Sequence, residues 1–207
     1  MSCNVTQSTW IVPATPPEVE PISLRPATTD DANLLSLIGG ATFLEAFTWM
    51  LPGEDILAHC TRNHSPESYR KYLAQPTTSI TLAVTGGGAP VGYAMVTAPD
   101  LPSFDLLPGD IELKRIYLFS RFRGPETPVL DAAGYPVPGL RVGQALMQSS
   151  TRAAISMGCR RLLLGTHENN QRAIAFYRRN GFREVGTRTF QVGSQSCCDL
   201  IFGRDLP

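Results

Sequence analysis

Residues 170–182 read Asn-Gln-Arg-Ala-Ile-Ala-Phe-Tyr-Arg-Arg-Asn-Gly-Phe and are the most informative stretch of this 207-residue chain. They predict a helix over residues 171–180, which Gly181 ends because glycine readily adopts the left-handed conformation of a C-terminal helix cap. Two β-rich runs, residues 182–190 and 196–202, follow this helix and predict the last two strands.

A strand, a helix and a second strand precede this stretch. Residues 111–118 are β-rich, and their apolar residues change phase in the middle of the run, which predicts a β-bulge. Residues 142–157 predict a helix that Gly158 ends, and residues 161–164 are apolar enough for a buried strand parallel to its neighbour. This alternation is typical of an α/β fold.

The N-terminal half predicts a strand, two helices and a hairpin. Residues 22–25 form the strand, and residues 28–31 supply a cap and early acidic residues for the first helix. The second helix begins at Ser65-Pro66, and two strands, residues 80–84 and 91–96, flank a glycine-rich turn. The apolar residues of the first helix predict one stripe that faces the core: Leu34, Leu37, Ile38, Ala41, Leu44 and Phe47.

The turn before the 142–157 helix contains glycine and arginine. Residues 138–145 read Pro-Gly-Leu-Arg-Val-Gly-Gln-Ala, and free backbone N–H groups at a helix N-terminus can hold phosphate oxygens. Gly143 would let the backbone approach such a ligand closely, and Arg141 and Arg123 would add charge-assisted hydrogen bonds to a pyrophosphate. A glycine at this place also serves packing or capping, so the turn alone does not identify the ligand.

Two segments resemble the motifs of the GNAT N-acetyltransferase superfamily, in the order that the superfamily uses. They are Glu112-Leu-Lys-Arg-Ile-Tyr-Leu118, before the turn, and residues 170–182, after the next strand. The resemblance covers about residues 22–206 and is strongest from Glu112 onward. The C-terminal segment from Gly181 to Ile201, together with Thr42-Phe43, more particularly resembles the sequences of PaiA-like polyamine acetyltransferases of bacteria.

The resemblance implies an α/β fold with a mixed, splayed central β-sheet of about seven strands, flanked by about four helices. We expect one GNAT domain over residues 22–207, after a flexible proline-rich arm over residues 1–21. One departure stands out, because a Pro-rich insertion at about residues 125–138 interrupts the turn, and Arg141 stands where the superfamily has its middle glycine. Whether this insertion covers the cofactor or reaches the substrate is open.

The resemblance also implies a mechanism in which an amine directly attacks the thioester of acetyl-CoA in a ternary complex, without a metal. Tyr177 matches the tyrosine that protonates the leaving thiolate, and Glu112 is the best candidate for a general base that acts through water. The bulged strand would leave a slot for the pantetheine arm, with an N–H near Leu118 facing the thioester oxygen. The residues implied in cofactor binding are Ile116, Tyr117, Leu118, Arg123, Arg141, Val142, Gly143, Gln144, Ala145, Asn170, Ala173 and Phe176.

Each of these roles has a simpler structural alternative. Tyr177 could pack its ring beside the neighbouring phenylalanine and place its hydroxyl at the surface. Glu112 could pair with Arg115 or another cation. Asn170 could cap the helix that follows it, which is compatible with cofactor binding.

Histidine and cysteine supply weaker candidates. His167, directly after the 161–164 strand, is an alternative base, but an isolated histidine is more often a loop residue. Cys197 and Cys198 lack a histidine near by in sequence and are interpreted as packing residues. The five cysteines are odd in number and lack metal-site spacing, which favours a reducing, intracellular setting over a disulfide framework or a zinc site.

We expect the acceptor to be an amine of a small molecule, with a polyamine as one candidate. Its cavity would be built from the first two helices and their linker (residues 43–65), the loop of residues 99–108 and the last two strands. Acetylation of a protein or peptide amine, and acetyl-CoA binding without catalysis, are the alternative functions. Several acidic residues near these segments would attract a cationic amine, although most such charges are simply solvated. They are Glu45, Glu54, Asp55, Asp100, Asp105 and Asp110.

The charge balance indicates which partners are not expected. Eighteen basic and eighteen acidic residues cancel without a dense basic block, so neither nucleic acid nor an anionic membrane is expected as a partner. Because there is neither a signal-peptide pattern nor an apolar run of about 18 residues, we expect a cytoplasmic location, which the sequence does not separate from a nuclear one. A homodimer is left open.

Overall fold

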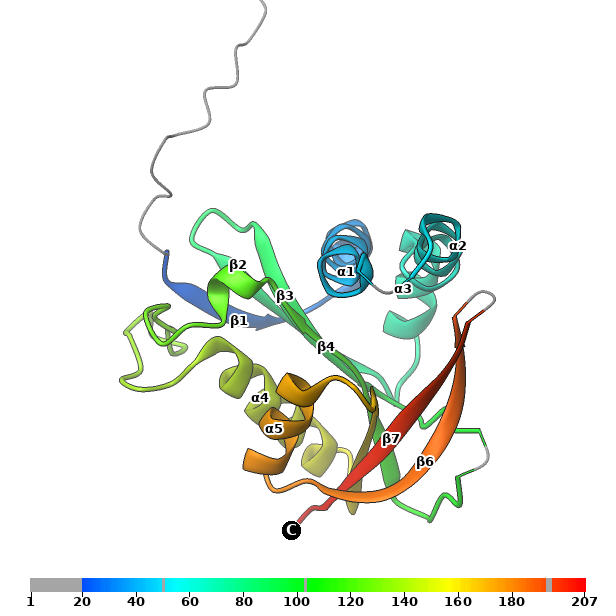
Figure 1. The fold of residues 1–207 in the computed structure, drawn as a ribbon. Coiled ribbons are helices and arrows are strands. Elements are labelled where there is room, and N and C mark those ends of the chain that lie inside the picture. Colours follow the sequence, from blue (N-terminus) through cyan, green and yellow to red (C-terminus); the bar gives the residue numbers. More distant parts are fainter. Residues whose placement is uncertain (1–19, 50, 103, 193–194) are drawn as a thin grey trace, which may run out of the picture.

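A seven-stranded mixed sheet separates two groups of helices in the computed structural model (Figure 1). The structure describes residues 20–49, 51–102, 104–192 and 195–207. Helices α1, α2 and α3 lie on one face of the sheet, and α4 and α5 lie on the other. The predicted α/β fold class is thereby confirmed, whereas the predicted arm at residues 1–21 lies almost entirely outside the described residues.

The strands follow the order β1-β2-β3-β4-β5-β7-β6, in which the described neighbours β4 and β5 pair in parallel and the other neighbours pair antiparallel. The strands are β1 (Ile22–Pro26), β2 (Ser79–Thr85), β3 (Pro90–Thr97), β4 (Asp110–Leu118), β5 (Arg161–His167), β6 (Arg183–Val192) and β7 (Gln195–Asp205). The helices are α1 (Ala32–Phe47), α2 (Gly53–Asn63), α3 (Pro66–Leu73), α4 (Val142–Ser156) and α5 (Gln171–Arg179), with short 3-10 turns η1 (Thr29–Asp31) and η2 (Ser120–Phe122).

The parallel strands β4 and β5 diverge along their length. Their pairing ends at Glu112 and Leu163, although β4 continues to Leu118 and β5 continues to His167. The register of β4 against β3 shifts at Lys114, the one residue of that stretch without a partner. This is the bulge that the apolar phase predicts, and a bulge bends its strand. We call the diverging ends, residues 113–118 of β4 and 164–167 of β5, the β4–β5 fork.

The buried face of α1 differs from the predicted stripe. Leu37 and Leu44 are 65% and 46% exposed, whereas Leu35 and Gly39 are buried. Contact with α3 selects this face, because a Cβ on Gly39 would lie only 2.3 Å from the Tyr69 hydroxyl oxygen. Apolar spacing could not identify the face, since α1 carries apolar residues on most of its circumference.

Helix α2 lies in the 43–65 segment, for which the sequence analysis predicts a linker. The signal that would have found it is charge: Glu54 and Asp55 stand in its first turn and Arg62 in its last, as the helix dipole favours. Ile56 of α2 packs on Phe43 in a small separate core. The linker prediction was therefore wrong for residues 53–63.

The Pro-rich insertion lies at the β1 edge of the sheet. Ile22 donates its N–H to the Pro128 carbonyl at 2.8 Å, and its own carbonyl accepts the N–H of Leu130 at 2.9 Å. Val129, between them, is only 2% exposed. Residues 128–130 therefore extend the sheet beside β1.

Further features bear on the expected function classes. No described helix is long and apolar enough to cross a bilayer. A search of the described residues also finds no group of three or more His, Cys, Asp or Glu side chains placed to hold a metal ion. The described thiols of Cys60, Cys159 and Cys198 are free.

A first prediction concerns Asp31, which ties β1 to the start of α1. Its carboxylate accepts two hydrogen bonds from Arg25, both at 2.7 Å, and one from the Thr28 N–H at 2.8 Å. The bond to Arg25 outweighs the effect of burial and lowers the pKa of Asp31 from 3.8 to about 2. A carboxyl group with a lowered folded-state pKa stabilises the protein above its unfolded pKa, and this stabilisation is lost as pH falls toward 2.

Asp31→Asn should therefore lower the free energy of unfolding by about 1–2 kcal/mol at neutral pH, and by less as the pH approaches 2. Urea denaturation of both proteins between pH 7 and the lowest pH at which the fold persists would measure this difference. Asp30→Asn is the matched control, because Asp30 is exposed on the same turn. Equal losses in the two variants, or a difference that does not change with pH, would contradict the prediction.

Candidate active site

The β4–β5 fork leaves backbone groups of β4 without strand partners. Phe119 donates its N–H to the Val91 carbonyl of β3 at 3.0 Å. Because backbone groups alternate in direction along a strand, those of Ile116 and Leu118 point away from β3, toward β5. The described part of β5 does not pair with them. An extended chain placed in the fork could therefore complete the hydrogen-bond ladder of β4.

Arg123 lies at the open end of the fork. Its Nε donates to the Leu118 carbonyl at 2.8 Å, and its Nη2 lies 3.2 Å from a carboxylate oxygen of Glu45. Burial and the nearby positive charge of Arg172 lower the pKa of Arg123. Two like charges thus lie near each other beside the fork, and an anion bound there would relieve their repulsion.

Glu45 connects α1 to the end of β4. Besides Arg123, its carboxylate accepts the N–H of Ser120 at 3.1 Å and the hydroxyl of Ser120 at 2.9 Å. Asp110, at the opposite end of β4, forms an ion pair with Arg161 at 2.6 Å. Both acids are among those expected to attract a cationic amine, and both have structural partners instead.

The first turn of α4 offers N–H groups to a ligand. The N-cap residue, Arg141, contributes no side-chain acceptor, and the turn contains no acidic residue. A Cβ on Gly143 would meet only the Phe176 ring, at an ordinary 3.8 Å, so packing does not require glycine there. Val142 and Ala145 are buried and anchor the turn. The positive end of the helix dipole is therefore available to an anion.

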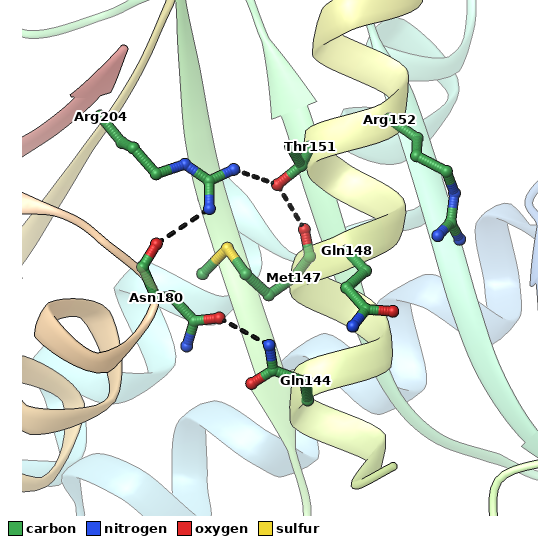
Figure 2. Close-up of a pocket in the computed structure, with 7 residues that line it drawn as sticks. All are labelled: Gln144, Met147, Gln148, Thr151, Arg152, Asn180 and Arg204. Carbon is green, nitrogen blue, oxygen red and sulfur yellow. Dashed lines mark hydrogen bonds between the residues drawn. The ribbon is translucent and has the colours of Figure 1, made fainter. Parts of the chain in front are cut away.

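Gln144 lies in the first turn of α4, where the sequence predicts it, and its side chain reaches the end of α5. Its side-chain amide donates to Asn180 Oδ1 at 3.0 Å, at the far end of α5 (Figure 2). Both residues line a cavity of about 220 Å³, in which Arg204 also donates to the Asn180 carbonyl at 2.9 Å. Gln144 is the one predicted site residue that lines this cavity, which is a feature separate from the fork.

Helix α5 places Tyr177 beside the fork. Its ring packs against Phe176, Phe182 and Phe202, with centroid distances of 5.7, 6.1 and 6.3 Å. Tyr177 is 8% exposed, and no hydrogen bond joins its hydroxyl to another described residue. Burial, together with the nearby Tyr117, raises its pKa well above the ordinary value of 10. The hydroxyl is therefore protonated and available as a donor.

Asn170 and His167 shape the turn between β5 and α5. The Asn170 side chain accepts the N–H of Ala173 at 3.2 Å and thereby caps α5. His167 accepts the N–H of Asn169 through Nδ1 at 3.2 Å. The capping role that the sequence left open for Asn170 is thus present, whereas His167 is the last residue of β5 and is not a loop residue.

Glu112 lies at the closed end of the fork. It is 2% exposed, and its Oε2 accepts the N–H of Asp100 at 2.9 Å and lies 3.4 Å from the Lys114 ammonium. The suggested pairing with Arg115 does not occur, because Arg115 instead donates to the Asn63 carbonyl at 3.0 Å. Glu112 is therefore a buried carboxylate that already has two partners.

The sheet face opposite α4 and α5 carries a second buried carboxylate, Asp199 of β7. Arg188 donates to its Oδ2 through Nε and Nη2, at 3.2 and 3.1 Å. The Arg188 guanidinium lies over Gly165 of β5, where a Cβ would come within 2.8 Å of Nη2. Burial raises the pKa of Tyr117, and the positive charge of Arg115 opposes this rise. The negative charge of Asp199 adds to the rise, because it disfavours a second negative charge on Tyr117.

A hydrogen-bonded aromatic cluster beneath α1 and α3 supports the same face of β4. The hydroxyls of Tyr93 and Tyr69 are 2.7 Å apart, and Tyr69 lies 2.8 Å from His64 Nδ1. The Arg115 guanidinium lies 5.3 Å from the centre of the Tyr69 ring. Burial and the charge of Arg115 lower the pKa of His64 to about 2, so this histidine is neutral at neutral pH. The cluster fixes Tyr117, whose ring centroid is 5.9 Å from that of Tyr93.

Three residues beside the fork are missing from the predicted set. Arg172 lies inside the 170–182 motif and could have been noticed there as a second cation. Asp199 and Arg188 are cross-strand partners on β7 and β6. The available signal was an opposite charge pair across a predicted hairpin, but the register that brings them together had to be known first.

Comparison with known proteins gives a consistent assignment. The model of the acetyltransferase (GNAT) family matches residues 138–182. An uncharacterized N-acetyltransferase of Mycobacterium bovis is 30% identical over 176 residues, covering 85% of this chain and 98% of the relative. A protein of Mycobacterium tuberculosis with the same description matches to the same extent.

Solved structures share the fold. The PaiA N-acetyltransferase from Thermoplasma acidophilum, solved in complex with coenzyme A, has a TM-score of 0.66 at 16% identity, covering 89% of this chain and 98% of that one. A GCN5-related N-acetyltransferase from Rhodopseudomonas palustris has a TM-score of 0.62 at 17% identity, covering 91% of this chain and 98% of that one. At these identities the likeness is one of fold.

Proposed function

This chain belongs to the GNAT family of acetyltransferases, and from that premise we propose that it transfers the acetyl group of acetyl-CoA to an amine of a small molecule. The observation that carries the proposal is the β4–β5 fork. It combines backbone groups of Ile116 and Leu118 that have no strand partner on β5, an uncapped α4 N-terminus and the Tyr177 hydroxyl without a partner among the described residues.

The donor acetyl-CoA fits the residues of the fork. Ile116 and Leu118 would bond the amide groups of the pantetheine arm, as an added strand would. The N–H groups around Gly143 would hold the pyrophosphate, supported by the charges of Arg123 and Arg172. When bound, acetyl-CoA supplies an activated acyl group with a thiol as leaving group.

The chain itself contributes positioning and proton transfer. Leu118 would direct its N–H at the thioester oxygen, where negative charge develops during attack. Tyr177 would donate its proton to the departing sulfur. Holding amine and thioester in one geometry replaces a bimolecular encounter, and this is a large part of the rate enhancement that such a site can give.

The acceptor would approach from the face that carries Tyr117, opposite α4 and α5. Glu112 and Asp199 are buried there, so the face favours an amine that arrives as an ammonium ion. A polyamine is one member of this class, and the acceptor class is what the following experiment would decide.

The direct test is a thiol-release assay with acetyl-CoA and a panel of polyamines, amino acids, aminoglycosides and short peptides, combined with calorimetric titration of acetyl-CoA. Turnover of one class of small amine is the expected result. Turnover of peptides alone would replace the small-molecule acceptor with a protein or peptide acceptor. Acetyl-CoA binding without any turnover would favour a non-catalytic binding protein.

A second prediction separates cofactor binding from folding at Gly143. Gly143→Asp places a negative charge in the first turn of α4, where the helix dipole tolerates it but a pyrophosphate would be repelled. Gly143→Asn has nearly the same shape without the charge, and Cβ has room in both variants. We expect Gly143→Asp to bind acetyl-CoA at least about tenfold more weakly than Gly143→Asn at low ionic strength, a difference of about 1.4 kcal/mol.

Calorimetric titration of both Gly143 variants measures this difference, and thermal unfolding verifies that both are folded. Raising the salt concentration should reduce the difference, because salt screens exposed charges. Equal affinities in the two variants would place the pyrophosphate elsewhere.

A further inference from the structure

Two buried carboxylates, Glu112 and Asp199, lie at different depths along the β4–β5 fork. Glu112 is level with Leu163, where the pairing of β4 and β5 ends, whereas Asp199 is level with His167, four residues farther along β5. At about 3.3 Å per residue, this places Asp199 roughly 13 Å closer to the open end. Ile116, whose backbone faces the fork, is likewise four residues beyond Glu112.

The side chain of Asp199 lies on the acceptor face of the sheet. Leu200 and Phe202, on the same strand as Asp199, pack in the core beneath α4 and α5. Side chains alternate along a strand, so Asp199 and Ile201 point to the opposite face. Ile201 packs there on Leu163. The effect of Asp199 on the pKa of Tyr117 places its charge near the β4 side of the fork as well.

Each carboxylate is already bound through one of its two oxygens, but by different groups. Glu112 accepts the N–H of Asp100 and lies beside the Lys114 ammonium, both through Oε2. Asp199 is held by Arg188 through Oδ2, and no hydrogen bond joins Oδ1 to another described residue. Arg188 therefore fixes the carboxylate while one oxygen stays available.

We propose that Asp199 holds the ammonium group of the acceptor and takes its proton, as the general base of acetyl transfer in place of Glu112. This inference rests on the proposed function and assigns the base within that same site. Arg188 is then a positioning residue, because it acts through Asp199.

The proton balance of the step is complete with the groups present. The ammonium R–NH₃⁺ donates one proton to Asp199 Oδ1, and the neutral nitrogen forms a C–N bond with the thioester carbon as the C–S bond breaks. The sulfur leaves with the bonding electron pair and takes the Tyr177 proton. The second nitrogen proton returns to the Tyr177 oxygen, and Asp199 releases its proton to water, so one proton is released per turnover.

The charged groups that face Asp199 set the expected pH dependence. Burial raises its pKa above the usual 3.8, and Arg188 on β6 and His167 on β5 oppose this rise. Tyr117 on β4 is neutral, and the Cys198 thiol is exposed on the same strand. A base must be deprotonated to act, so activity should fall as pH drops through the pKa of Asp199. Loss of Arg188 should move this fall to higher pH.

The test compares Asp199→Asn with Glu112→Gln, each of which replaces a carboxylate with an amide of the same shape. We expect Asp199→Asn to lower kcat/KM for the best acceptor by about 10²-fold or more and to abolish the acid limb of the pH profile. Glu112→Gln should retain the acid limb. Arg188→Gln should shift the limb to higher pH, and Asp199→Glu should restore part of the activity.

Measurements other than turnover distinguish loss of the base from a structural effect of the substitution. Calorimetry should give unchanged acetyl-CoA affinity in Asp199→Asn, and NMR titration of ¹³C-labelled aspartate carboxyls should assign a raised pKa to the signal that this variant removes. A retained acid limb in Asp199→Asn, or its loss in Glu112→Gln, would overturn the inference while leaving the proposed function intact. Absence of turnover in the wild-type protein would overturn both.

Discussion

Tyr177→Phe is expected to lower kcat about 10²-fold while leaving the fold and the affinity for acetyl-CoA unchanged. The variant removes only a hydroxyl that has no hydrogen-bond partner among the described residues. The phenylalanine ring keeps the contacts with Phe176, Phe182 and Phe202, so no cavity forms. The loss should therefore appear in catalysis and not in stability. Steady-state kinetics and calorimetry measure the two parts separately.

The pH profile gives an additional test of Tyr177. Because the pKa of Tyr177 lies well above 10, its hydroxyl stays protonated throughout the neutral and mildly alkaline range. An acid with a raised pKa loses activity only above that pKa, so wild-type activity should show no decline from this group below about pH 10. A decline near pH 8 that Tyr177→Phe removes would contradict this protonation state.

Tyr93→Phe is the matched control for loss of a tyrosine hydroxyl. Tyr93 is fully buried, and its hydroxyl lies 2.7 Å from that of Tyr69. Removing this bond should lower the free energy of unfolding by about 1 kcal/mol and leave kcat close to the wild-type value. If the two variants lose activity equally, Tyr177 acts through packing and is not the proton donor.

The largest expected effect on stability is at Gly39. Gly39→Ala should lower the free energy of unfolding by about 1–3 kcal/mol, because its Cβ would meet the Tyr69 hydroxyl at 2.3 Å and His64 Nδ1 at 2.4 Å. These two atoms are 2.8 Å apart and form one hydrogen bond of the buried aromatic cluster. Moving them apart breaks that bond in a place without solvent to replace it.

Gly40→Ala, one residue along the same helix, should have the opposite sign. A Cβ there meets nothing within 4 Å, and alanine in a helix is favoured over glycine by about 0.5–1 kcal/mol. Urea denaturation of both variants measures the two effects with the same change of side chain. If Gly39→Ala also stabilises the protein, α1 can move away from α3, and the close packing of the helices is not required.

Much of the fold followed from the sequence because the decisive signals are local. Helices α4 and α5 are followed by Gly158 and Gly181, which adopt left-handed conformations with φ of 74° and 81°. The phase change in the 111–118 run predicted the β4 bulge without reference to any partner strand. The motif at residues 170–182 placed Asn170 at the start of a helix and Tyr177 farther along it, where the structure has them.

Other features depended on which elements meet. The core-facing side of α1 was mispredicted because the helix is apolar on most sides and only contact with Tyr69 and His64 selects one. The bond from the Gln144 amide to Asn180 joins α4 to the end of α5, and no pattern within the 138–145 turn indicates it. Such choices are made by tertiary packing, which a one-dimensional pattern does not contain.

The sequence by itself determined the family, the strand and helix order around the fork and the glycine-containing turn before α4, because each is encoded within a few consecutive positions. Only the tertiary structure decided which carboxylate lies nearer the open end of the fork. Asp199 is 87 residues from Glu112 in the chain, and its place opposite His167, beyond the end of the β4–β5 pairing, follows from the register of β7 on β5. Hydrogen bonds between distant strands set that register, and a shift by one residue would point Asp199 to the opposite face.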